Sequence, residues 1–165
     1  MKNPLVGIIM GSGSDIAVME HAARVLEEFE IPFEMKVLSA HRTPDQAAEY
    51  AKGLADRGIK VLIAGAGWAA HLAGVSAAQT PIPVIGVPID SSPLNGMDSL
   101  LSTVQMPPGV PVAAMAIGKG GAYNAAVFAV RILCLLDPEL ASRYASFRKK
   151  MAEEVMSNQN LKIQK

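Results

Sequence analysis

Short apolar runs recur along the chain and are separated by longer amphipathic stretches. The first run, Leu5–Met10, is continuously apolar and is closed by Gly11, which is typical of a buried strand. Four later runs have similar length and are bounded by glycine, proline or polar residues. The sequence therefore predicts five strands, at Leu5–Met10, Phe33–Leu38, Val61–Ala64, Val84–Val87 and Val112–Ile117.

The stretches between these runs have the 3.6-residue period of helices. In the first of them, Ile16, Met19, Ala23, Leu26 and Phe29 form one apolar stripe. The second predicted helix has Gly58 placed as its C-terminal cap. The last begins at Asp137-Pro138, carries its own apolar stripe, and gives way to a polar tail over 157–165 that we expect to fray. The helices are predicted at 16–29, 44–57, 69–80, 98–103, 121–136 and from 138 onward.

Strands that alternate with helices predict a parallel sheet with right-handed crossovers. The expected fold class is α/β, a flavodoxin-like three-layer sandwich with a five-stranded parallel sheet and an extra C-terminal helix. We take the strand order 2-1-3-4-5 from its frequency in such folds, because nothing in the residues specifies it. The expected organisation is a single domain over 1–165, whose last helix is available to a neighbouring subunit.

Composition narrows the classes of function. Fifteen basic and fifteen acidic residues balance, which argues against a general nucleic-acid or membrane-surface binder. Cys134 is the single cysteine, so it forms no internal disulfide and supplies no metal cluster; this fits an intracellular, reducing compartment. No signal-like or membrane-spanning run is evident. The chain is 50% hydrophobic, which predicts that some apolar surface is buried between subunits.

Three glycine-rich turns follow three of the predicted strands, at Gly11–Ser14, Gly65–Gly67 and Gly118–Gly121. Glycine lets backbone amides approach an anion at the start of a helix. None of the turns has P-loop spacing, and the first holds only a fragment of the dinucleotide fingerprint. Each turn alone is explained by chain geometry, but together with Arg42 they suggest one site for a mononucleotide phosphate.

The segment Ser39–Pro44 combines a histidine, an arginine and hydroxyls just before a predicted helix. Thr43 as N-cap, Pro44 in the first turn and Gln46 three residues after Thr43 match a capping box. From the residues alone, a helix cap and an active site remain equally open for this segment.

The other candidate groups are an acidic residue and three histidines. Asp15 is either a cap or a ligand for ribose hydroxyls. His41 and His71 follow strand ends at the expected ligand edge, whereas His21 lies within the first helix. Histidine can both donate and accept a proton in one turnover. No metal-ligand spacing links the three histidines, so no metal is expected.

Five motifs are spread in order along the chain: Met10-Gly-Ser-Gly-Ser-Asp15, Ser39-Ala-His-Arg-Thr-Pro44, Gly65-Ala-Gly-Trp-Ala-Ala-His-Leu72, Asp98-Ser-Leu-Leu-Ser-Thr-Val-Gln-Met-Pro107 and Ala116-Ile-Gly-Lys-Gly-Gly-Ala122. Together they closely resemble the PurE family of purine biosynthesis, and the likeness runs from about Pro4 to the last helix. The resemblance implies a cytoplasmic homo-octamer whose subunits complete one another's sites. Its reaction would move a carboxyl group from N5 to C4 of an aminoimidazole ribonucleotide, with CO2 as a trapped intermediate and with no metal, biotin or ATP.

The resemblance also implies roles for particular residues. His41 would be the acid–base residue, Asp15 would bind the ribose hydroxyls, and Ser12 and Arg42 would hold the 5′-phosphate with Ser39 nearby. The loop after the third strand would wall the pocket for the migrating carboxyl group, through Gly67, Ala70, His71 and Leu72. Two residues of this region depart from the usual family pattern: Trp68 replaces a small residue and Ala73 a proline.

Two alternatives remain open beside a mutase, the type of enzyme that moves the carboxyl group within one molecule. A related PurE class carboxylates aminoimidazole ribonucleotide directly with CO2. The chain could also be a non-catalytic flavodoxin-like module that binds a nucleotide or a partner, although His41, Arg42 and the glycine turns at one sheet edge argue against that reading.

Overall fold

The computed structural model describes residues 3–157 and contains a parallel sheet in the order β2-β1-β3-β4-β5. The predicted α/β fold and the strand order taken from fold frequency are both confirmed. The strands are β1 (Val6–Met10), β2 (Phe33–Val37), β3 (Val61–Ala66), β4 (Val84–Pro88) and β5 (Ala113–Ala114). The helices are the 3-10 turn η1 (Gly13–Asp15), α1 (Ile16–Glu28), α2 (Pro44–Lys52), α3 (Leu72–Ala77), α4 (Met97–Val104), α5 (Lys119–Cys134) and α6 (Pro138–Ser157).

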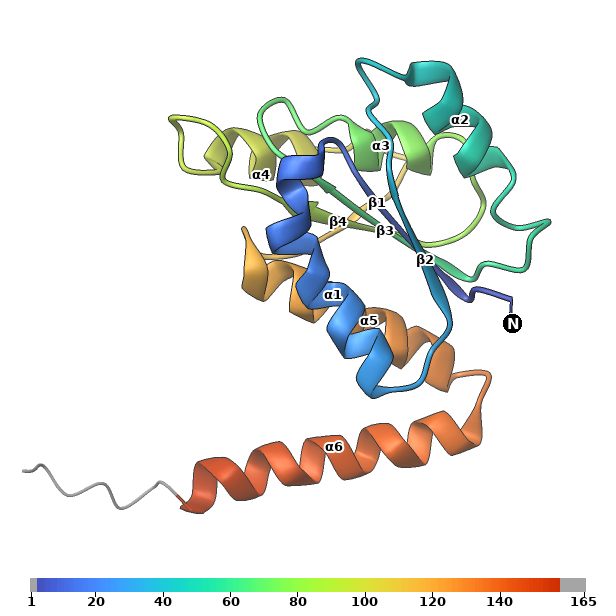
Figure 1. Cartoon of the computed structure of the whole chain (residues 1–165), viewed down its shortest axis with the longest axis vertical. Coiled ribbons are helices and arrows are strands. Elements are labelled where there is room, and N and C mark those ends of the chain that lie inside the picture. Colours follow the sequence, from blue (N-terminus) through green and yellow to red (C-terminus); the bar gives the residue numbers. More distant parts are fainter. Residues whose placement is uncertain (1–2, 158–165) are drawn as a thin grey trace, which may run out of the picture.

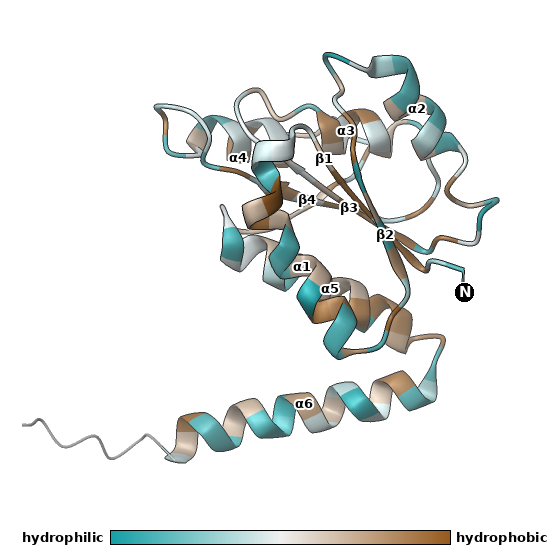
Figure 2. Cartoon of the chain, viewed as in Figure 1, coloured by the Kyte–Doolittle hydropathy of each residue, from teal (hydrophilic) through white to brown (hydrophobic). Residues whose placement is uncertain are grey.

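Helices cover both faces of the sheet. Helices α1 and α5 pack together on one face, whereas α2, α3 and α4 lie on the other (Figure 1). The central strands β1, β3 and β4 are almost entirely buried, and they form a brown, hydrophobic centre in Figure 2. Burial on both faces explains why these three strands are continuous apolar runs rather than alternating ones.

Three predicted elements exceed the observed ones by more than one residue: α2, α3 and β5. Helix α2 ends at Lys52, not at residue 57, because Gly53 forms its C-cap and the chain then turns to bury Leu54 completely. Gly58 still adopts the left-handed conformation expected of a cap (φ +82°), but it closes this turn and not the helix. Helix α3 spans only Leu72–Ala77 of the predicted 69–80.

The fifth strand is also shorter than its apolar run. Only Ala113 and Ala114 pair with β4, out of the predicted 112–117. As the last strand in the order, β5 pairs on one side only, so few ladder hydrogen bonds hold its ends in place.

Helix α6 lies outside the three layers and packs on α5 (Figure 1). Its first half is anchored by Tyr144 and Phe147, whose rings contact Phe29 of the α1 C-cap at centroid distances of 6.3 and 5.2 Å. Leu140 is its only buried residue among those described. Of the predicted tail, Ser157 ends α6, and 158–165 lie outside the described residues.

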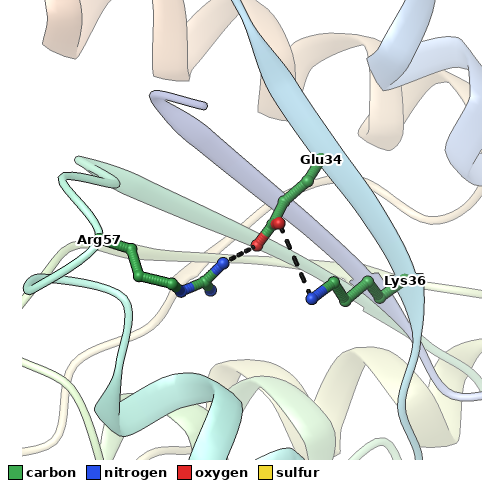
Figure 3. A network of polar contacts seen from close by, with 3 residues as sticks. All are labelled: Glu34, Lys36 and Arg57. Carbon is green, nitrogen blue, oxygen red and sulfur yellow. Dashed lines mark hydrogen bonds and ion pairs between the residues drawn. The ribbon is translucent and has the colours of Figure 1, made fainter. Parts of the chain in front are cut away.

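A charged cluster joins β2 to the turn after α2. Glu34 accepts a hydrogen bond from Arg57 and pairs with Lys36 at 3.8 Å (Figure 3). Burial opposes ionisation of Glu34, but the hydrogen bond from Arg57 and the two positive charges outweigh it, so the pKa of Glu34 is lowered. Burial is also the main cause of the raised pKa of Tyr50, whose ring lies beneath Lys36 and Arg57.

Within the described residues, no helix is both long and apolar enough to cross a membrane.

Candidate active site

A cavity of about 440 Å³ opens at the carboxyl ends of the central strands. Parallel α/β sheets bind ligands at this edge. The loops after β1, β2, β3 and β4 all contribute to it. Its lining consists of Gly11, Ser12, Ser14, Asp15, Ser39, Ala40, His41, Arg42, Ala66, Gly67, Trp68, Ala69, His71, Leu72 and Ser91.

The turn after β1 is built around a buried carboxylate. Ser12 and Asp15 form a reciprocal capping box, in which Ser12 N donates to Asp15 Oδ2 at 3.0 Å and Ser12 Oγ accepts from Ser14 N. The Ser14 hydroxyl donates to Ser12 Oγ at 3.0 Å. The turn therefore holds two serine hydroxyls and one carboxylate in a fixed cluster beside the cavity.

Asp15 is only 5% exposed, which is unusual for a carboxylate. Its burial raises the pKa of the carboxyl group, and the hydrogen bonds from Ser12 and Ser14 and the charge of Arg42 oppose this rise. Asp15 thus both caps η1 and lines the cavity, so the two roles that the sequence left open are compatible.

The loop after β2 is closed by Ser39 and Thr43. Ser39 N donates to Thr43 Oγ1 at 2.9 Å, and the Thr43 hydroxyl donates to Ser39 O at 3.1 Å. The predicted capping box with Gln46 is wrong, because the Thr43 hydroxyl is engaged with Ser39 and makes no side-chain cap. Pro44 does occupy the first turn of α2, as predicted.

Arg42 is held over the neighbouring turn. Its Nη2 donates to Gly11 O at 2.8 Å, and its backbone N donates to the Ser39 hydroxyl at 3.2 Å. The first of these bonds ties the loop after β2 to the loop after β1, and the second fixes Arg42 within its own loop. An exposed guanidinium is thereby placed beside Ser12 and Ser14, a group of donors suited to a phosphate.

His41 and His71 both line the cavity, and their side chains are in direct contact. His41 Nε2 lies 2.7 Å from His71 Nδ1, and the two rings meet edge to face at 77°. At this distance one nitrogen must donate and the other accept, so the two rings share a single proton at their contact. The sequence placed both histidines at one sheet edge, but their contact depends on two loops 30 residues apart.

The loop after β3 provides the apolar part of the wall. Gly67 and Leu72 line the cavity, with Leu72 only 2% exposed. Ala70 is also 2% exposed but is absent from the lining, so it supports the loop from behind. Trp68 lines the cavity and is 60% exposed.

One lining residue was not among the predicted site residues, and one glycine-rich turn that was expected at the site lies elsewhere. Ser91 follows β4 and lines the cavity; a hydroxyl just beyond a strand end was the signal for it. The turn Gly118–Gly121 does not line this cavity. A Cβ at Gly121 would collide with Ala116 O, so this glycine allows close packing of the backbone. In the described part of the chain, no group of three or more His, Cys, Asp or Glu residues is placed to hold a metal ion.

A family model described as AIR carboxylase matches residues 5–154. The chain belongs to this family. The match contains every residue of the cavity, and it confirms the family resemblance that the five motifs carry.

Individual relatives align over almost the whole chain. The N5-carboxyaminoimidazole ribonucleotide mutase of Bacillus subtilis is 57% identical over 155 residues, covering 94% of this chain and 96% of the relative. The enzyme of the same name from Pyrococcus abyssi is 60% identical over 148 residues, covering 90% and 84%. Among solved structures, Treponema denticola PurE superposes with a TM-score of 0.84 at 31% identity, covering 94% of this chain and 96% of that one.

Proposed function

We propose that this protein is a mutase of purine biosynthesis that converts N5-carboxyaminoimidazole ribonucleotide to 4-carboxy-5-aminoimidazole ribonucleotide. Family membership and the names of relatives at 57% and 60% identity carry this proposal. The supporting observation in the structure is the convergence of His41, His71, Arg42 and Asp15 on one cavity.

The two ends of the cavity suit the two ends of the ribonucleotide. Arg42 and Ser12 would bind the 5′-phosphate, since a guanidinium fork and a hydroxyl match phosphate oxygens. Asp15 would accept hydrogen bonds from the ribose hydroxyls. Ser39 would act indirectly, because its hydroxyl accepts from the backbone of Arg42 and so orients that residue.

The reaction needs proton transfers and a closed space. The N5–carboxylate bond breaks to release CO2 while N5 gains a proton, and C4 of the ring then attacks the CO2 carbon. The proton on C4 leaves afterwards and restores the aromatic ring. We assign both transfers to His41, and general acid–base catalysis of this kind is worth about 10²–10⁴-fold in rate.

His71 would position His41. Because the two rings share one proton at a 2.7 Å contact, protonation of His41 at Nε2 directs that hydrogen toward His71 Nδ1. The apolar wall from Gly67 to Leu72, with Ala70 behind it, would retain CO2 and exclude water. The bond changes and proton transfers given above balance without biotin, ATP or a metal.

The curated names favour the mutase over the direct carboxylase and the non-catalytic module. The proposal also includes the assembly, the location and the partners of the enzyme. A homo-octamer would cover the exposed apolar side chains of α4 and α6, such as Leu101 and Val155. The enzyme would work in the cytoplasm, where its nucleotide substrate is made. Its small-molecule partners would be that ribonucleotide and CO2, and it would bind neither nucleic acid nor a membrane.

The decisive experiment follows the carboxyl carbon. Purified protein is given the ribonucleotide labelled with ¹³C in the N5 carboxyl group, in buffer equilibrated with unlabelled bicarbonate. A mutase carries the label to C4 despite the unlabelled pool. A product that is unlabelled, or that forms only from aminoimidazole ribonucleotide plus CO2, would identify a direct carboxylase and overturn the proposal.

His41→Asn tests the assigned acid–base residue. We expect turnover to be abolished while ribonucleotide binding, measured by calorimetry, is largely kept. Near-normal activity of this variant would remove His41 from the proton transfers.

A further inference from the structure

Trp68 has a backbone conformation that its side chain disfavours. Its φ is +54°, in the left-handed region. In the described chain, Glu30 and Asn95 are the other non-glycine residues with positive φ. Glu30 follows the end of α1, where a left-handed residue commonly terminates a helix, and asparagine tolerates this region well. A bulky aromatic residue at such a φ is an outlier that signals a functional constraint.

Packing in the core does not offset this strain. Trp68 is 60% exposed, although it is the largest apolar residue type and the chain has only one tryptophan. Exposed tryptophan is unusual in a folded chain. Glycine would fit this position without strain, so what the indole contributes must come from a contact that forms outside the isolated chain.

The location of Trp68 identifies that contact. It lines the cavity between Gly67 and Ala69 and lies three residues before His71, whose ring contacts His41. Trp68 and Leu72 are the large apolar residues of the lining, and Leu72 is buried in the wall. Phosphate and ribose are strongly hydrated, so the flat heterocycle is the part of a ribonucleotide that gains most from an aromatic surface.

We propose that Trp68 packs its indole against the aminoimidazole ring and covers the end of the cavity where the carboxyl group moves. This inference rests on the proposed function and assigns a substrate-contacting, specificity-determining residue to it. The strained φ of Trp68 would be retained because it places the indole where bound nucleotide can contact it. In that complex the indole would hold the aminoimidazole ring beside His41 and restrict the escape of CO2.

The single tryptophan makes the contact directly observable. Indole emission is recorded while the wild-type protein is titrated with 5-aminoimidazole ribonucleotide or with ribose 5-phosphate, and calorimetry confirms saturation by each. We expect the ring-bearing ligand to quench and shift the emission and the ringless ligand to leave it nearly unchanged. Equal responses, or no response at saturation by the ribonucleotide, would overturn the inference.

Variants separate this role from a structural one. Trp68→Gly relieves the φ strain, so we expect an unchanged or higher Tm together with a KM raised about 3- to 10-fold, the usual worth of an aromatic stacking contact. Trp68→Phe should recover part of the affinity. Leu135→Ala is the matched control, since Leu135 is 82% exposed at the far end of α5 and its loss should change neither value.

Three further outcomes remain distinguishable. A lower Tm with an unchanged KM in Trp68→Gly would make Trp68 structural, and a changed oligomeric state with ligand-insensitive emission would place it at a subunit contact. Either result overturns the inference while wild-type turnover stands. Absence of carboxyl transfer in the wild type would instead overturn the proposed function, whatever the emission shows.

Discussion

Gly67→Ala is expected to destabilise the protein and to disturb the cavity through one added carbon atom. A Cβ at position 67 would collide with Ser91 Oγ and would lie 2.9 Å from Ser91 Cβ and 3.1 Å from Ile89 O. The Ser91 hydroxyl can rotate away. The Cβ of Ser91 and the carbonyl oxygen of Ile89 cannot move in this way, so the loops after β3 and β4 must separate by a few tenths of an ångström.

The size of the effect follows from two opposing contributions. Overpacking of this kind costs about 1–3 kcal/mol. Replacing glycine by alanine at an ordinary φ gains about 0.4–1 kcal/mol by restricting the unfolded chain. The net loss is about 1–2 kcal/mol, which for a chain of this length lowers Tm by about 2–8 °C. Because both loops line the cavity, we also expect kcat/KM to fall by about 10-fold or more.

The assay is a thermal melt and a carboxyl-transfer rate for a double-mutant cycle of Gly67→Ala and Ser91→Gly. Ser91→Gly removes both side-chain atoms that obstruct the new Cβ, so it should rescue the double variant in part, with Ile89 O left in close contact. Gly120→Ala is the control, because a Cβ there meets no atom within 4 Å and should stabilise α5. A Gly67→Ala protein as stable and active as wild type would contradict the predicted steric conflict. So would a variant that is equally impaired whether or not Ser91 is replaced.

Three further predictions concern charged and titratable groups. Arg42→Ala should raise KM about 30-fold with little change in kcat, since charge-assisted hydrogen bonds to phosphate worth about 2 kcal/mol are lost. The KM of Arg42→Lys should lie between those of wild type and Arg42→Ala. An unchanged KM of Arg42→Ala in steady-state kinetics would contradict the phosphate role. His71→Asn should lower kcat on the order of 10- to 100-fold, because His41 loses the ring that orients it, while nucleotide affinity by calorimetry is kept; wild-type kcat would show that His71 does not position His41. Glu34→Gln should cost less than about 1 kcal/mol at pH 7 in chemical denaturation. The folded-state pKa of Glu34 lies below its ordinary value of 4.5, so the ionised carboxylate stabilises the fold fully above pH 4.5. Below that pH, the difference in unfolding free energy between wild type and Glu34→Gln should shrink. A difference that grows in acid would contradict the assigned ion pair.

The α/β class and the turns that carry the site can be predicted from the amino-acid sequence. Strands β1, β3 and β4 are buried on both faces, so their positions are visible as unbroken apolar runs. The residues that line the cavity follow strand ends directly, and parallel strands bring their carboxyl ends to one edge. For this reason Ser12, Asp15, His41 and Arg42 could be expected at a common site.

The lengths of the helices and strands and the contacts of the side chains depend instead on tertiary packing. Helix α2 stops early because Leu54 turns into the core, and Thr43 bonds to Ser39 because the loop closes on itself. The 2.7 Å contact of His41 with His71 and the strained φ of Trp68 depend on how separate loops are held by the sheet. Local sequence patterns record burial and period, whereas contacts between distant segments depend on the packed fold as a whole.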